Sequence, residues 1–413
     1  MLDIKYIREN SEKVKEGIKT KQHDPKIVDQ ILLADRKKRE ILEEAEKLRA
    51  ERNKLAKVGK ETPEAKKLKG RLKLVEQELK KAEGELSGLM LQFPNLPASD
   101  VPLGRDESEN KVIRAWGKPT EFSFKPKDHL ELGELLDVID VKRAAKVSGS
   151  RFGYLKNEGT LLEFALVRLV FDTLVKEGFI PVVPPVFISD KSMRGMGYLE
   201  HRGEEETYHF QKDGLYLIGT SEQAVGPMHR DEIFEEKDLP RRYVAFSTCF
   251  RREAGSYGKD TRGILRVHQF DKLEMFSFIQ PDQSDKEHEY LVAMEEKLVQ
   301  MLELPYQVVK ICTGDLGAPA SRKYDIECWL PSENRYRETH SCSTCTDFQA
   351  RRLNIKYKEA GKTDFVHTLN GTAFAIGRTI LAILENYQQE DGSVLIPKAL
   401  QNYTGFSKIS PRK

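Results

Sequence analysis

The sequence predicts an α+β protein, in which an N-terminal antiparallel α-helical coiled coil precedes an antiparallel β-sheet flanked by helices. Three observations predict this fold class. An apolar seam of heptad type runs through the first hundred residues. Beyond about residue 118, β-type runs outnumber the helices that could cross between parallel strands. The chain also contains no Walker-type phosphate loop and no GxGxxG motif, which disfavours a doubly wound nucleotide-binding sheet.

Residues 1–97 are predicted to form a helical arm, with two long helices joined by a polar turn near Gly59–Pro63. Apolar positions recur at spacings of three and four, which is the a/d pattern of a coiled coil. The simplest pairing is an antiparallel hairpin of about 45 Å, at 1.5 Å per residue. Pro94 and Pro97 end the second helix. The seam of the first helix is Ile31, Ala34, Lys38, Ile41, Ala45, Leu48, Arg52 and Leu55, and that of the second is Ala65, Leu68, Leu72, Val75, Leu79, Ala82, Leu86 and Leu89.

Basic side chains are concentrated at the expected tip of this arm, between Lys47 and Lys73, where only Glu51, Glu61 and Glu64 are acidic. Such a segment suits a polyanion. Charge alone does not distinguish a polyanion-binding segment from a solvated helical tip. The basic residues are Lys47, Arg49, Arg52, Lys54, Lys57, Lys60, Lys66, Lys67, Lys69, Arg71 and Lys73.

Residues 98–117 are polar and irregular and are predicted to be a linker, and residues 118–413 are predicted to form the second domain. We expect strands within Tyr243–Phe250, Ile264–Phe270 and Met275–Ile279, with Tyr243–Ile279 forming a strand, loop, strand hairpin. We expect helices at Leu161–Lys176, Lys286–Leu302 and Ala373–Tyr387.

The bulk composition indicates a polar protein, with 39% hydrophobic and 32% charged residues in 413. No window approaches the roughly 18 apolar residues that a membrane span needs. The N-terminus has no signal-peptide or transit-peptide pattern, so we expect a cytoplasmic protein without a membrane partner. Cys342 and Cys345 form a lone CxxC, for which ordinary reduced thiols are a better interpretation than zinc.

The segment Thr248–Glu274 carries the residue types that a nucleotide and an amino acid would need. Its arginines can grip phosphate and carboxylate oxygens bidentately. The glycine-bearing loop Ala254–Gly263 can fold over a ligand, and Phe270 offers a face to a flat ring. A solvated charged hairpin would explain the charges. It would not explain glycines and arginines interleaved with an aromatic residue between two apolar strands.

Several segments, in order along nearly the whole chain, together resemble the seryl-tRNA synthetase family of class II aminoacyl-tRNA synthetases. Gly178–Pro185 resembles motif 1 of that class, and Asn370–Gln388 resembles motif 3. Phe250–Glu253 and the run from Arg262 to Glu274 together resemble motif 2. The start MLDIKYIREN, the coiled-coil arm, Thr220-Ser221-Glu222 and the block Cys345–Arg352 are also typical of the family.

The resemblance implies an activity and a set of roles for the nucleotide. Serine would attack the α-phosphorus of ATP to give seryl-adenylate and pyrophosphate, and the 3′ end of tRNA(Ser) would then take the serine. These steps need positioning and charge stabilisation rather than a protein nucleophile. Arg251, Glu274 and Arg378 are implied to be catalytic, with Arg251 bridging the α-phosphate and the carboxylate. The implied ATP-binding residues are Arg251, Arg252, Glu253, Arg266, Val267, Phe270, Glu338, Thr339, His340, Ser341 and Arg378.

The same resemblance implies a Mg²⁺ ion held by Glu338 and Ser341, since this hard ion prefers a few oxygen ligands together with phosphates. Serine would be bound by Thr220, Ser221, Glu222, Arg251, Glu274, Asn370 and Thr372. Thr220 and Glu222 would hold its ammonium group, and Glu274 with Thr372 its hydroxyl. Alanine has no hydroxyl and would leave these hydrogen-bonding groups unpaired. This cost can favour serine over alanine on the order of 10⁴-fold.

Two departures from the family pattern affect these expectations. His340 stands where a serine is frequent, and it could either perturb the metal site or pack in the interior. Thr372 and Phe374 replace smaller residues of motif 3, and they could narrow the serine pocket. Neither change removes a charged group that the mechanism needs.

For the arm, the resemblance implies contact with the long variable arm of tRNA(Ser), and with tRNA(Sec) where that tRNA exists. Arg49, Arg52, Lys54, Lys66 and Lys67 are the implied tRNA-binding residues. Motif 1 implies a homodimer, with Pro184 and Pro185 near the interface. Two other interpretations stay open: a ligase that passes an activated amino acid to a carrier, which would lack an intact arm, and a non-catalytic RNA-binding scaffold, which would lack the arginines.

Overall fold

The computed structural model describes residues 1–56, 63–200, 203–254 and 263–412. It divides into two compact units, Met1–Leu96 and Pro97–Lys413. The predicted turn near Gly59–Pro63 and most of the predicted loop Ala254–Gly263 lie outside the described residues, as do Lys57 and Lys60.

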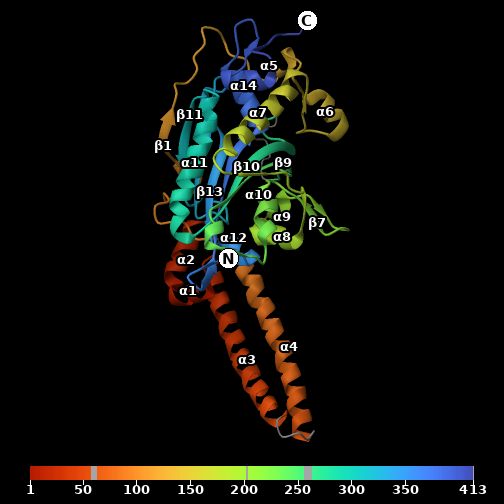
Figure 1. Cartoon of the computed structure of the whole chain (residues 1–413), viewed down its shortest axis with the longest axis vertical. Helices are drawn as coiled ribbons and strands as arrows, with labels where there is room; N and C mark the ends of the chain where they lie inside the picture. The colour runs from red at the N-terminus through yellow and green to blue at the C-terminus, as the bar shows by residue number, and fades with distance from the viewer. Residues whose placement is uncertain (57–62, 201–202, 255–262, 413) are drawn as a thin grey trace. The chain divides into compact units, whose positions relative to one another are not determined.

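The N-terminal unit is helical, and its two long helices are α3 (Lys26–Ala56) and α4 (Pro63–Leu91). Two ion pairs join them, Lys37–Glu85 at 2.9 Å and Arg49–Glu76 at 3.0 Å. From the first pair to the second, the residue number rises in α3 and falls in α4. The helices are therefore antiparallel, as the seam predicted, and they lie side by side (Figure 1).

The predicted seam positions are mostly buried, with Ala45, Leu48, Leu72 and Val75 among the residues that pack between the two helices. The prediction of only two helices in this unit is incomplete, because α1 (Ile4–Glu9) and α2 (Ser11–Thr20) precede them. These short helices pack through buried Ile7, Val14 and Ile18 against the start of α3 and the end of α4, including Ile31, Leu86 and Met90.

The second unit is built on an eight-stranded sheet in the order β1-β11-β12-β13-β16-β10-β9-β4. All neighbours are antiparallel except β4 and β9, which are parallel. The predicted hairpin is confirmed as β9 and β10. The strands are β1 (Lys111–Trp116), β4 (Ile180–Val182), β9 (Arg241–Phe250), β10 (Gln269–Ile279), β11 (Tyr306–Lys310), β12 (Arg322–Leu330), β13 (Arg335–Thr346) and β16 (His367–Ala375).

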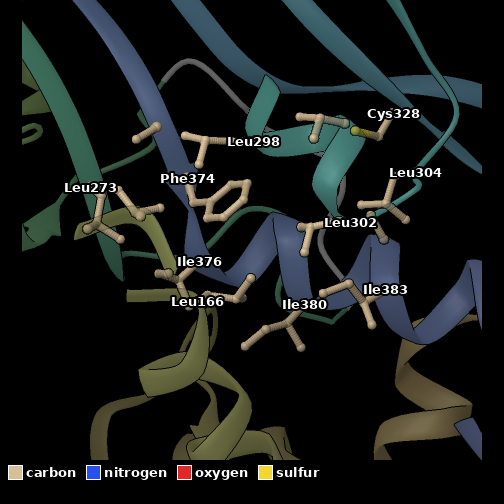
Figure 2. Close-up of a cluster of buried hydrophobic side chains, with 14 of the residues drawn as sticks. Leu166, Leu273, Leu298, Leu302, Leu304, Cys328, Phe374, Ile376, Ile380 and Ile383 are labelled. Carbon is tan, nitrogen blue, oxygen red and sulfur yellow. The ribbon is translucent and has the colours of Figure 1, made fainter. Parts of the chain in front are cut away.

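Helices cover one face of this sheet and bury the main hydrophobic core there (Figure 1). The long ones are α7 (Glu158–Leu174), α11 (Ser284–Met301) and α13 (Ile376–Asn386). Figure 2 shows Leu298, Leu302, Ile376 and Ile380 in this core, together with Phe374 from the sheet.

Shorter elements surround the sheet. The helices are α5 (His129–Leu135), α6 (Val141–Ser148), α8 (Asp190–Met196), α9 (Gly203–Glu206), α10 (Glu222–Val225), α12 (Phe348–Leu353) and α14 (Lys398–Thr404). The remaining strands form four small sheets. Two are two-stranded: β2 (Ile139–Asp140) with β3 (Tyr154–Leu155), and β17 (Val394–Leu395) with β18 (Lys408–Ile409). Two are three-stranded: β5 (Phe187–Ser189) with β7 (Leu215–Leu217) and β6 (His209–Phe210), and β8 (Ile233–Glu235) with β14 (Lys356–Glu359) and β15 (Lys362–Phe365).

Three segment predictions need correction. The predicted linker 98–117 is not wholly irregular, since Lys111–Trp116 is the edge strand β1, paired with β11. The strand predicted at Ile264–Phe270 begins only at Gln269. The helix predicted from Ala373 begins at Ile376, because Ala373–Ala375 still belong to β16.

Candidate active site

A cavity of about 590 Å³ lies in the second unit, on the sheet face that the core helices do not cover. The same strands line both the cavity and the hydrophobic core, because successive side chains of a strand point to opposite faces of the sheet. The cavity-side residues of the central strands include Lys272, Glu274, Ser341, Ser343, Asn370 and Thr372, and the core-side residues include Leu273, Met275, Cys342, Leu369 and Ala373.

Two irregularities in the strand pairing change this alternation where it matters. Ile326 pairs with His340 and Glu327 with Glu338, so Thr339 is an additional residue, a β-bulge, in β13. Glu338 and Ser341 are three residues apart and would face opposite sides of a regular strand. Across the bulge, both line the cavity. A second bulge, in β16, similarly brings both Thr372 and Ala375 to the cavity wall.

One end of the cavity is lined by Arg251, Arg266 and Arg378. Arg251 follows β9, and its Nε donates to the carbonyl oxygen of Gly219 at 3.1 Å. Its guanidinium lies 5.2 Å from the centre of the Phe270 ring. Arg378, near the start of α13, donates through Nη1 to the carbonyl oxygen of Glu338 at 2.9 Å. Three guanidinium groups around one cavity suit a ligand with several negative charges.

Carboxylates accompany these arginines. Arg266 Nη1 is 2.9 Å from Glu253 Oε2, and Glu253 has a φ of 53°, a left-handed backbone that is rare for a non-glycine residue. Arg378 Nη1 is 3.4 Å from Glu338 Oε1. Removal from bulk water would raise the pKa of Glu338. The cations Arg378, Lys323 and Arg251 outweigh this effect and lower its pKa to about 2, so Glu338 is an anion at neutral pH.

The other end of the cavity is small, acidic and hydroxyl-rich. Glu222, the first residue of α10, and Glu274 of β10 are both buried and line it with Thr220 and Thr372. Burial and the neighbouring Glu274 raise the pKa of Glu222 to about 7, although Tyr198, which donates its hydroxyl to Glu222, and Lys272 and Arg251 oppose the rise. Thr372 Oγ1 donates to Glu274 Oε2 at 3.4 Å.

Thr220 also leaves an unused polar atom at this end. Its Oγ1 is buried and has no hydrogen-bond partner among the described residues. Buried hydroxyls are normally paired. An ammonium group bound between Thr220 and Glu222 would supply the missing donor, and the two carboxylates would balance its charge.

The oxygen atoms of Glu338 and Ser341 form the chemistry that a magnesium ion prefers, since one is an anionic carboxylate and the other a hydroxyl on the same wall. Asp325 lies nearby in β12. Burial raises its pKa to about 7 despite its 3.1 Å ion pair with Lys323. Within the described residues, no three His, Cys, Asp or Glu side chains are grouped as metal ligands.

Comparisons with known proteins agree over the whole chain. Residues 1–97 match the seryl-tRNA synthetase N-terminal domain, and residues 207–387 match the tRNA synthetase class II core domain (G, H, P, S and T). The chain is 48% identical to a serine–tRNA ligase of Dictyoglomus turgidum, with 100% of both chains covered. It therefore belongs to the seryl-tRNA synthetase family.

Solved structures of the family have the same fold. The seryl-tRNA synthetase of Pyrococcus horikoshii, crystallised with ATP, superposes with a TM-score of 0.94 at 43% identity, and both chains are covered completely. A cytoplasmic serine–tRNA ligase of Naegleria fowleri, in complex with AMP, superposes with a TM-score of 0.89 at 32% identity, covering 100% of this chain and 99% of that one.

Most residues expected from the family resemblance meet in the cavity. They are Thr220, Glu222, Arg251, Glu253, Arg266, Val267, Phe270, Glu274, Glu338, Thr339, Ser341, Asn370, Thr372 and Arg378. Ser221 and Arg252 do not line it. Ser221 is fully buried, and the guanidinium of Arg252 lies over the Tyr208 ring, 5.8 Å from its centre.

His340 also faces away from the cavity, so the expectation that it binds ATP is not supported. Its ring packs edge-on against Phe374, with the ring centres 5.7 Å apart. Burial lowers the pKa of His340 to about 3, so the imidazole is neutral. Phe374 lies in the core (Figure 2) and does not narrow the pocket. His340 and Phe374 are therefore interior packing residues, whereas Thr372 lines the cavity.

Sequence reasoning missed several polar residues of the cavity, among them Tyr198, Lys272 and Lys323. Lys272 could have been found, because it lies two residues before Glu274 and so shares its face of the strand. Tyr198 follows α8 outside any regular pattern, and nothing in the sequence indicates that its hydroxyl reaches Glu222.

The predicted tRNA-binding residues lie on the arm. Arg52, Lys54, Lys66 and Lys67 are exposed, and Arg49 pairs with Glu76. Arg52 and Lys66 line a groove of about 650 Å³ between α3 and α4, over a floor that includes Leu55 and Leu68. In the described part of the chain, no helix is long and apolar enough to cross a membrane.

Proposed function

We propose that this protein activates L-serine with ATP and transfers it to the 3′ end of tRNA(Ser). One observation carries the proposal: a single cavity joins a small acidic, hydroxyl-bearing end to an end lined by three arginines. The first suits a small amino acid with an ammonium group and a hydroxyl, and the second suits a triphosphate. Membership of a family whose Pyrococcus horikoshii representative was crystallised with ATP supports the same conclusion.

The side chains would act by positioning. Glu222 and Thr220 would bind the ammonium group of serine, and Glu274 with Thr372 its hydroxyl, beside Asn370. Arg251 would exchange its contact with Phe270 for a bridge between the serine carboxylate and the α-phosphate. Phe270 and Arg378 would then hold the adenine from its two faces, with Glu253 accepting from the adenine amino group. Holding the reactants in line lowers the activation barrier without a covalent enzyme intermediate.

Glu338 and Ser341 would hold a magnesium ion, which would neutralise phosphate charge when bound. The independent contribution of this chain is to keep Glu338 ionised. Arg378 and Lys323 do so before any ligand binds.

Residues 1–97 would be the tRNA-binding arm and residues 118–413 the catalytic domain. The basic side chains on the arm support contact with a phosphate backbone. We include tRNA(Sec) in the proposed range where it occurs. The protein would act in the cytoplasm, where its product is consumed.

The test is ATP–pyrophosphate exchange with each of the twenty amino acids, with tRNA charging measured beside it. We expect exchange and charging with serine alone. Exchange with serine but no charging of any tRNA would favour a ligase that serves a carrier, and no exchange with any amino acid would favour a scaffold. Charging of purified tRNA(Ser) and tRNA(Sec) transcripts tests the tRNA range.

A further inference from the structure

Lys272 forms a buried ion pair inside the amino-acid end of the cavity. It lies two residues before Glu274 on β10, so both side chains point to the same face. Lys272 Nζ is 2.6 Å from Glu274 Oε2, and the side chains are only 8% and 3% exposed. Placing an ammonium group in so dry a site costs solvation energy, which this ion pair must offset. Because burying this charge is costly, we expect the contacts of Lys272 to give it a role that offsets the cost.

The two oxygens of Glu274 are used differently. Oε2 is the atom contacted by Lys272 and, at 3.4 Å, by the Thr372 hydroxyl. Oε1 receives no hydrogen bond from any residue that the structure describes, and it is not sealed from solvent as the unpaired oxygens of Glu295 are. An ionised carboxylate accepts at both oxygens. Lys272 and Thr372 thus fix the plane of Glu274 through one oxygen and leave the other for a ligand.

The charges around this pair are mostly negative. Among the described residues, Arg251 is a second cation that acts on these acids, and it would turn to the serine carboxylate and the α-phosphate during the reaction. Lys272 would then be the cation that stays with the two acids. The titratable groups that face the pair are Glu222 and Tyr198 on the cavity side, Cys249 of β9, and Glu295 and Cys342 on the core side.

We propose that Lys272 is a specificity-determining positioning residue, which holds Glu274 so that one carboxylate oxygen is presented to the hydroxyl of the amino acid. The proposal rests on the proposed function. It adds that serine selectivity depends on a cation which need not touch the amino acid. A neutral side chain of similar length should therefore weaken serine binding without disturbing the ATP end of the cavity.

The test compares wild-type protein with Lys272→Met in serine-dependent pyrophosphate exchange. We expect KM for serine to rise about 10- to 100-fold, the value of a hydrogen bond to a charged group, with KM for ATP and kcat little changed. The preference for serine over alanine should fall by a similar factor. Lys272→Arg, which keeps the charge, should recover part of the loss.

The dependence of KM for serine on pH gives a second test, because a purely structural role of Lys272 would leave that dependence unchanged. Lys272 opposes the rise in the pKa of Glu222, so its removal should raise that pKa further. Because Glu222 must be ionised to bind an ammonium group, KM for serine should increase as the pH falls. The midpoint of that increase should lie at higher pH in Lys272→Met than in the wild type.

The matched control is Lys323→Met, which removes the second lysine of the same cavity. Lys323 pairs with Asp325 at 3.1 Å, near Glu338. We expect it to raise KM for ATP and to spare KM for serine. Equal effects of the two variants on both substrates, or an unchanged KM for serine in a folded Lys272→Met protein, would overturn the proposal. Failure of the proposed function would appear separately, as absent serine exchange in the wild type.

Discussion

At the scale of single residues, Arg251 and Arg252 are neighbours in the chain but differ in environment. Arg251 lines the cavity and Arg252 lies over Tyr208 outside it. We predict that Arg251→Ala lowers kcat for serine-dependent exchange by at least about 100-fold, as expected for a lost donor to developing charge. Arg252→Ala should stay within about 2-fold of the wild type, which is typical of an exposed substitution.

The two exchange rates should be measured on variants with unchanged circular dichroism. Equal activity in the two variants would show that serine-dependent exchange does not depend on a guanidinium group inside the cavity at this position. It would also remove Arg251 from the mechanism.

His288 of α11 makes acid stability a second prediction at this scale. Its ring is fully buried and stacks on Tyr324, and its Nε2 donates to the carbonyl oxygen of Cys342 at 3.1 Å. A carbonyl oxygen accepts, so Nε2 carries the proton. Burial lowers the pKa of His288 to about 4. Between pH 6.5 and 4 the unfolded chain therefore binds a proton that the native protein does not.

The contribution of His288 to the free energy of unfolding should be complete above pH 6.5. It should fall by about 1.4 kcal/mol per pH unit below that, to a total of about 3 kcal/mol. Denaturant titrations of the wild type and His288→Gln at pH 7.5 and 5 test this. The difference between the two proteins should shrink at the lower pH, and a constant difference would contradict the burial argument.

Site residues could be predicted from the sequence where their roles are typical of a motif. They could not where the strand pairing decides which face of the sheet a side chain occupies. Arg251, Glu274 and Arg378 have charges that match the ligand, and the structure brings them to one cavity. The side on which His340 lies depends on the bulge at Thr339, which no local pattern indicates. Counting residues along β13 cannot tell a cavity residue from a core residue without that pairing.

At the scale of elements, the arm yields a prediction that separates binding from chemistry. Replacing Arg52, Lys54, Lys66 and Lys67 by alanine should weaken tRNA charging and reduce its dependence on salt, because fewer phosphate contacts release fewer counterions. Serine-dependent exchange should be unchanged, since no tRNA takes part in it. The measurement is KM for tRNA at several salt concentrations.

A control variant with alanine at Arg36, Lys80 and Lys81 removes exposed basic residues from other positions on the same two helices. It should charge tRNA nearly as the wild type does. An equal loss in both variants would mean that general positive charge, rather than the groove region, binds the tRNA. A loss of exchange in the first variant would mean that the arm is not a separable element.

Elements with a long one-sided pattern were predicted, and elements without one were not. The seam of α3 and α4 repeats over eight positions each, so its period stands out from chance. Strand β1 is exposed along its whole length as an edge strand, which leaves no apolar alternation to detect. Helices α1 and α2 are only 6 and 10 residues long, too short for a clear period.

At the scale of the whole molecule, assembly remains a proposal supported by exposed apolar side chains. On the edge beyond β4, Val183 is 75% exposed, and Phe164 of α7 is 60% exposed. We predict that the protein is a homodimer and that Val183→Asp with Phe164→Asp makes it monomeric, because burying an unpaired charge is costly.

Sedimentation velocity at micromolar concentration measures this directly. The matched control is Val112→Asp on β1, an exposed apolar residue at the opposite edge of the sheet. The control should sediment as the wild type does. A wild-type monomer, or a dimer that survives the double substitution, would contradict the proposed interface.

The bulge in β13 gives this strand one residue of spare length. A deletion beside Thr339 can be absorbed if the strand pairs regularly, and Ser343 and the residues after it then keep their faces. An insertion has no such remedy, because it would add a further irregularity to a strand that already has one at Thr339 and another between Thr344 and Thr346. Over evolutionary time, changes of length at this point should therefore run toward shortening, and natural variants with an added residue there should be rare.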